Sequence, residues 1–126
     1  MRVMVFAVTL LVLIVALSWY STAYLQASAG GLLELLDGVE GEIRAGDWAA
    51  AQSSLRQVVD RWNTTHPYWK ILIDHREADE IETALTRLQS FAATRSHEEA
   101  MSELAVLRFR LQHIPAKERL TLSNIF

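Results

Sequence analysis

The polar residues with the most distinctive placement are Asp74 and His75, which interrupt a stretch of regularly spaced apolar residues. Helical periodicity puts Asp74 on the same face as Ile71 and Ala78, where an apolar residue is expected. A buried carboxylate is costly unless it is paired and hydrogen-bonded. We therefore expect Asp74 to be a structural contact that fixes helix register by accepting hydrogen bonds from a neighbouring helix.

A metal site is the alternative for the same region. His75 and Asp79 are four residues apart, which places both on one face of a helix. A third ligand would come from His66 or His113. Such pairs are common by chance, however, and the sequence has no His-Glu-x-x-His signature. We predict no metal and no other cofactor.

Three tryptophans, Trp48, Trp62 and Trp69, are expected near the turn between the second and third helices of the domain, together with His66 and Tyr68. Trp48 and Trp62 fall on the apolar face of their helix, which favours core packing. The alternative is an aromatic cleft for a peptide or glycan, in which the Asp-His pair supplies the polar contacts. The candidate polar cluster is therefore Trp62, His66, Trp69, Asp74 and His75.

The features expected of several other function classes are missing from the sequence. No Ser or Thr lies in a nucleophile-elbow glycine pattern, no glycine loop suits a phosphate, and the chain has no cysteine. The formal net charge is -3, whereas a nucleic-acid binder needs a basic face. We therefore expect neither an enzyme nor a nucleic-acid-binding protein.

An N-terminal apolar segment precedes the elements that would position these residues. Val3 to Leu17 is apolar except for Thr9, and the run reaches about eighteen residues with its flank, the short end of a membrane span. Trp19, Tyr20 and Tyr24 suit the membrane interface. We predict a single-pass membrane anchor over residues 1–29 and a separate domain over residues 30–126.

Two alternatives exist for this segment, a cleaved signal peptide and a buried helix. Ala27-Ser28-Ala29 fits a cleavage pattern, although it lies about ten residues beyond the apolar run. Arg2 precedes the segment, and no Lys or Arg follows it before Arg44. The positive-inside rule then predicts a cytoplasmic N-terminus and an extracytoplasmic domain.

The domain reads as a series of amphipathic helices. Its apolar residues recur at intervals of three and four, with Gly30-Gly31 as a possible hinge after the anchor and Gly46-Asp47 as the first helix boundary. We expect a break at Asn63-Thr64-Thr65 and a third helix that starts at Pro67. A capping box at Ser96 opens the fourth helix and Pro115 ends it, and the apolar tail 120–126 should pack on the bundle.

Short connections make successive helices antiparallel neighbours. The predicted fold is thus all-α, an N-terminal transmembrane helix followed by an up-and-down antiparallel bundle of about four helices. A weak self-similarity at an offset of about 49 residues relates Ala51, Leu55, Val58 and Trp62 to Ala100, Leu104, Leu107 and Leu111. Either duplicated helical hairpins or apolar spacing alone would produce it.

The chain resembles a known family at motifs spread over nearly its whole length. These are Asp47-Trp48, Trp62, Trp69, Leu72-Ile73-Asp74-His75, His113-Ile114-Pro115 and the segment from Leu120 to Ile125. The chain is similar to the bacterial domain of unknown function family 4363. The resemblance implies an N-terminal membrane segment and a helical remainder, but no activity, ligand or catalytic residue.

We therefore expect a membrane-tethered extracytoplasmic interaction or accessory protein in the cell membrane. Its partners would be the membrane and another membrane or envelope protein. The alternative is a module that binds a peptide, glycan or metal in a cleft formed by the tryptophans and the Asp-His pair.

Overall fold

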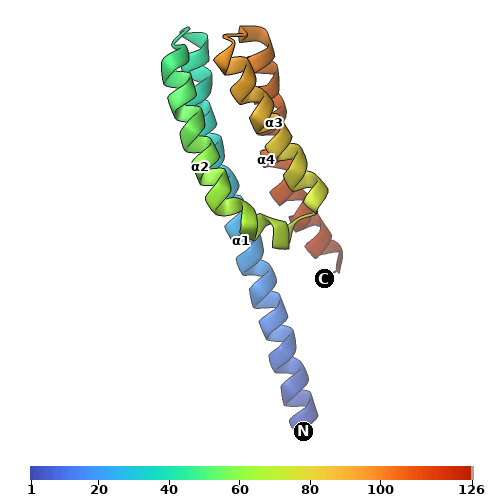
Figure 1. The fold of residues 1–126 in the computed structure, drawn as a ribbon. Helices are drawn as coiled ribbons and strands as arrows, with labels where there is room; N and C mark the ends of the chain where they lie inside the picture. The colour runs from blue at the N-terminus through green and yellow to red at the C-terminus, as the bar shows by residue number, and fades with distance from the viewer. Residues whose placement is uncertain (126) are drawn as a thin grey trace.

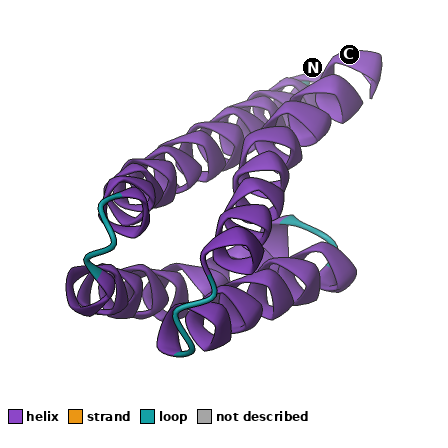
Figure 2. Ribbon diagram, turned by 90° about the horizontal axis from the view of Figure 1, so that it is seen from above, coloured by secondary structure: helices purple, strands orange, loops and turns teal. Residues whose placement is uncertain are grey.

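The protein consists of four helices joined by short connections, as seen in a computed structural model that describes the backbone of residues 1–125 and the side chains of residues 1–113. The helices are α1 (Arg2–Arg44), α2 (Trp48–Leu72), α3 (His75–Ala93) and α4 (His97–Ile125). Consecutive helices run antiparallel (Figure 1), and the bundle seen from above is shown in Figure 2. The predicted all-α bundle behind a long apolar N-terminal helix is confirmed.

Helix α1 belongs to two parts of the molecule. The part of α1 that precedes Leu25 projects beyond the bundle (Figure 1) and is called the stalk. Its side chains from Val3 to Leu17 are exposed. The C-terminal half of α1 packs against α2 and α4 and is buried from Leu25 onward. The helix continues without interruption through Gly30 and Gly31, so the expected hinge is not present. The core thus begins more than one turn before residue 30.

Close packing accounts for one of these glycines. A Cβ at Gly31 would lie 2.7 Å from Nη1 of Arg61, so the absence of a side chain lets the Arg61 guanidinium lie across α1. A glycine inside a helix costs about 1 kcal/mol relative to alanine. Burial of Ala29 and Leu32 on either side keeps the segment helical nonetheless.

The bundle consists of two hairpins with the same core pattern. The first hairpin buries Ala29, Leu32, Leu36, Val39, Ile43, Ala51, Leu55, Val58 and Trp62. The second buries Ala78, Ile81, Leu85, Leu88, Ala92, Ala100, Leu104, Leu107 and Leu111, each 49 residues further along the chain. The turns correspond too, since Gly46 and Arg95 have φ of 73° and 57°. The self-similarity in the sequence is therefore a correspondence of core and turn positions in three dimensions.

Two helix boundaries predicted from local signals are wrong. Helix α2 continues through Asn63-Thr64-Thr65 and Pro67 to Leu72. The Thr64 and Thr65 hydroxyls donate to the carbonyls of Asp60 and Arg61 at 3.0 and 2.8 Å, so both are satisfied inside the helix. Burial of Trp62 and Trp69 on one face then outweighs the backbone hydrogen bond that proline cannot make.

Helix α4 differs from its prediction in the same way. It passes Pro115 and extends to Ile125, so this proline does not end the helix. The side chains of the apolar tail, which were expected to pack on the bundle, lie outside the described residues.

The burial of Leu25 and Ala29 predicts how far the chain can be shortened. A protein that begins at Thr22 should unfold at a higher urea concentration than one that begins at Gly30, because the shorter protein lacks the buried Leu25 side chain. The expected difference in the free energy of unfolding is about 1.5–3 kcal/mol. Leu25→Ala in the longer protein is the matched control, and circular dichroism measures all three. Equal unfolding midpoints would contradict the placement of Leu25 in the core.

Candidate functional site

Trp62, His66 and Trp69 form an aromatic cluster on one face of α2. The Trp62 ring lies 5.0 Å from His66 and 5.5 Å from Trp69, measured between ring centroids, and the two indoles meet edge to face at 76°. Trp62 is 2% exposed and Trp69 is 0% exposed. Both indoles therefore fill the core, as the sequence favoured, instead of lining an open cleft.

The polar atoms of this cluster are unusual. Nε1 of Trp62, Nε1 of Trp69 and Nε2 of His66 are all buried and lack a hydrogen-bond partner among the described residues. A buried donor without a partner costs about 1–3 kcal/mol. Oε2 of Glu82 on α3 lies 4.0 Å from Nε2 of His66. A protonated His66 would form an ion pair with Glu82 across the contact between α2 and α3.

The structure corrects the interpretation of Asp74. Because α2 ends at Leu72, Asp74 is the N-cap of α3, and its carboxylate accepts a hydrogen bond from the backbone N–H of Arg76 at 3.0 Å. Asp74 is exposed, and the buried residue at this point is Ile73. The prediction that Asp74 is a buried contact fixing register is therefore wrong.

A local signal for the correct assignment was present in the sequence. Asp74 is followed three residues later by Glu77, the spacing that is typical of a helix N-terminus. Pro67 also favours a helix start, so the two signals predict different first residues for this helix, and the one at Asp74 is correct. His75 is the first residue of α3 and is exposed, so neither member of the Asp-His pair joins the buried aromatic cluster.

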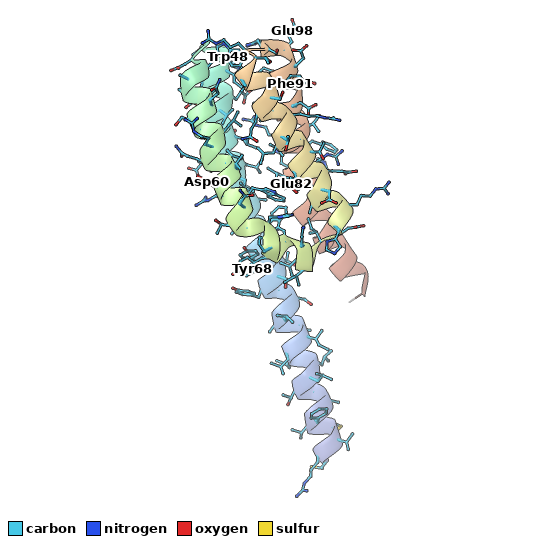
Figure 3. All side chains as sticks on the ribbon, in the orientation of Figure 1. Trp48, Asp60, Tyr68, Glu82, Phe91 and Glu98 are labelled. Carbon is cyan, nitrogen blue, oxygen red and sulfur yellow. The ribbon has the colours of Figure 1, made fainter. Side chains whose placement is uncertain are left out.

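Trp48 does not join the cluster either. It contacts His97 edge to face, with ring centroids 6.5 Å apart, at the start of α2 and α4. Figure 3 shows Trp48 near Glu98 at the end of the bundle opposite Tyr68. Among the side chains that the structure describes, no three His, Cys, Asp or Glu residues are grouped so that they could hold a metal ion.

The three residues predicted to lie at the membrane interface are found where the stalk meets the bundle. Trp19 and Tyr20 are exposed on α1, and the Tyr24 ring contacts the Tyr68 ring edge to face at 5.9 Å. The sequence predicts Tyr68 beside the tryptophans and Ile71 on the apolar face with Ala78, but both are exposed, Tyr68 at 59% and Ile71 at 82%, so these two placements are wrong. Tyr68 and Ile71 are three residues apart, on the α2 face away from Trp69. This spacing is the signal in the sequence that the two side chains share one face of the helix.

The fold and the stalk define a class of protein, a small bundle of two helical hairpins carried on an apolar N-terminal helix. Residues 19–125 match the family described as Domain of unknown function (DUF4363), and the chain belongs to this family. The resemblance seen in the sequence is therefore confirmed. Neither a curated protein nor a solved structure matched the chain.

The N-cap assignment predicts a modest effect of substituting Asp74. Asp74→Ala should lower the free energy of unfolding by about 0.5–2 kcal/mol, and Asp74→Ser should retain most of it because serine also caps helices. His75→Ala is the control and should change stability less. Thermal unfolding, with chelator and with excess Zn²⁺, measures all of them. Stabilisation by zinc that both Asp74→Ala and His75→Ala abolish would show a metal site instead.

Burial of Trp62 predicts a large effect. Trp62→Ala should cost about 3–5 kcal/mol because it removes a fully buried ring. Trp62→Phe should cost less, since phenylalanine keeps an aromatic ring in place and removes the unpaired N–H. Urea unfolding of the full chain in detergent gives both values. A loss below about 1 kcal/mol for Trp62→Ala would place this ring at a surface.

Proposed function

We propose that this protein is a single-pass membrane protein whose bundle faces the extracytoplasmic side and acts by binding another membrane or envelope protein. The observation that carries the proposal is the division of α1. One half is apolar and exposed on all sides, and the other half is part of the bundle core. An exposed apolar surface of this extent needs a covering, and a bilayer supplies one along the whole stalk.

The core supports a retained anchor over a cleaved signal peptide. Cleavage after Ala29 would remove Leu25 and Ala29, which are 2% and 3% exposed in the bundle. A mature protein starting at Gly30 would therefore lack part of its own core. The match to the family also begins at residue 19, before this site.

The orientation follows from the charges that flank the stalk. Arg2 precedes it, and the next basic residue is Arg44. Positive charge is retained on the cytoplasmic side of a membrane helix. The bundle then lies on the extracytoplasmic side.

A binding role is supported by how the polar and apolar side chains are distributed. The indoles are buried, whereas Asp74 and His75 are exposed at a helix end, so the groups that could do chemistry do not meet in a cleft. The outer face of α4 instead exposes Val106 and Phe109, a surface suited to a protein partner. We propose binding and no catalysis on this basis.

A second candidate is a module that binds a small ligand. The observation that favours it is that three nitrogens of the aromatic cluster lack a hydrogen-bond partner among the described side chains, and a ligand with oxygen acceptors would satisfy them. Such a ligand would have to separate α2 from α3 to reach the indoles. A loss below about 1 kcal/mol for Trp62→Ala would place the ring at a surface that a ligand could reach and would favour this candidate.

The proposed topology predicts the behaviour of the chain in cells. The full-length protein should remain in the membrane fraction after an alkaline wash, and protease added to spheroplasts should digest the bundle. Leu11→Arg should weaken membrane insertion, because an arginine at the centre of a span costs about 2.5–3.5 kcal/mol. Arg56→Leu, on the exposed face of α2, is the control and should leave insertion unchanged.

Two outcomes would contradict the topology. A mature N-terminus at Gly30 would show that the segment is a cleaved signal peptide. Protection of the bundle in intact spheroplasts, with digestion only after lysis, would show that the orientation is reversed.

A further inference from the structure

The end of α2 exposes apolar side chains beside the stalk. Ile71 is 82% exposed and Tyr68 is 59% exposed, although both lie in the last turns of a helix that is otherwise packed in the bundle. Together with Leu72 of the same helix and Leu17, Tyr20, Ser21 and Tyr24 of α1, they line an apolar groove of about 540 Å³. Figure 3 shows Tyr68 at this junction, where the bundle gives way to the stalk.

The length of the stalk indicates how deep in the bilayer this groove would lie. A hydrocarbon core of about 30 Å requires about twenty helical residues at 1.5 Å each. Counted from Val3, twenty residues end at Thr22. Leu17 and Tyr20 then lie within the hydrocarbon or at its boundary, and the end of α2, which lines the same groove, is at the same depth.

The side chains at the end of α2 suit that depth. Tyr68 has an apolar ring with a polar hydroxyl, the combination that is enriched at membrane interfaces. Lys70 is exposed on the same turn, and a lysine side chain at this depth could place its ammonium group among lipid phosphates while its methylene groups stay in an apolar environment. Ile71 has no polar group and would be covered only by a lipid chain or another apolar surface.

We propose that the end of α2, Tyr68–Leu72, is immersed in the outer leaflet and that the groove between it and α1 holds a phospholipid acyl chain. This inference rests on the proposed membrane anchor. The bundle is then attached to the bilayer at two places, the stalk and the end of α2. Contact at both places orients the bundle on the membrane.

Fluorescent labels at single cysteines test the proposal, because the natural chain has no cysteine. The full chain is reconstituted in phosphatidylcholine vesicles with a label at Ile71→Cys, Gln57→Cys or Leu11→Cys. Gln57 is exposed on α2 about 21 Å from Ile71 and is the matched control. Leu11 lies in the stalk and reports on the anchor itself.

Lipids with a nitroxide near the top of the acyl chain should quench the label at residue 71 at least about twofold, compared with unlabelled lipids, by direct contact with the chain. They should leave the label at residue 57 unchanged. A label at residue 71 that soluble iodide quenches as strongly as the label at residue 57, while the label at Leu11 is in the bilayer, would overturn the lipid contact and leave the anchor intact.

Two other outcomes have distinct meanings. A label at Leu11 that stays in water would overturn the proposed anchor itself. Shielding of residue 71 that disappears when the protein is diluted in lipid would identify a second copy of the chain as the occupant of the groove, and would also overturn the lipid contact.

Discussion

One constraint shapes the whole molecule: a single helix must suit two surroundings. The first half of α1 is apolar on every side, so it has no face that prefers water. The second half buries one stripe, from Leu25 to Ile43, and presents polar residues on the opposite side. The stripe packs against α2 and α4, so the direction of the stalk is fixed by the bundle core. The bundle is therefore a rigid extension of the stalk and not a domain on a flexible linker.

The bundle itself depends on apolar packing, while ion pairs connect particular neighbours. Arg108 of α4 contacts Asp37 and Glu40 of α1 at 2.5 and 2.6 Å, and Arg110 contacts Glu80 of α3. Exposed ion pairs contribute about 0–1 kcal/mol each, far less than the buried core. The Arg108 contacts join the two hairpins, whereas the Arg110 contact lies within the second hairpin. The Arg108 contacts distinguish the α1–α4 seam from the α2–α3 seam.

The sequence was sufficient to predict features that depend on residues close along the chain. The stripe of Leu32, Leu36, Val39 and Ile43 defines the core face of α1, and the predicted boundary at Gly46-Asp47 is confirmed, since Asp47 caps α2 by accepting from the Ala50 N–H at 3.1 Å. The predictions that are wrong concern positions where contacts between residues far apart in the sequence determine the helix boundaries. Burial of Trp69 keeps α2 helical past Pro67, and that extension makes Asp74 a cap. The contact between Tyr24 and Tyr68 joins residues 44 positions apart, which no local spacing encodes.

Because α1 is continuous, a tilt of the stalk moves the bundle with it as one rigid body. From Thr22 to Arg44 the helix rises about 33 Å at 1.5 Å per residue, so a change of about 10° in the tilt of the stalk displaces the far turns by about 6 Å. Membrane helices change tilt when bilayer thickness changes. If the stalk spans a bilayer as proposed, a thinner or thicker bilayer would shift the outer end of the bundle sideways, by a distance comparable to the spacing between neighbouring side chains. Under the proposed topology, lipid composition would in this way change the position of the outer end of the bundle relative to the membrane.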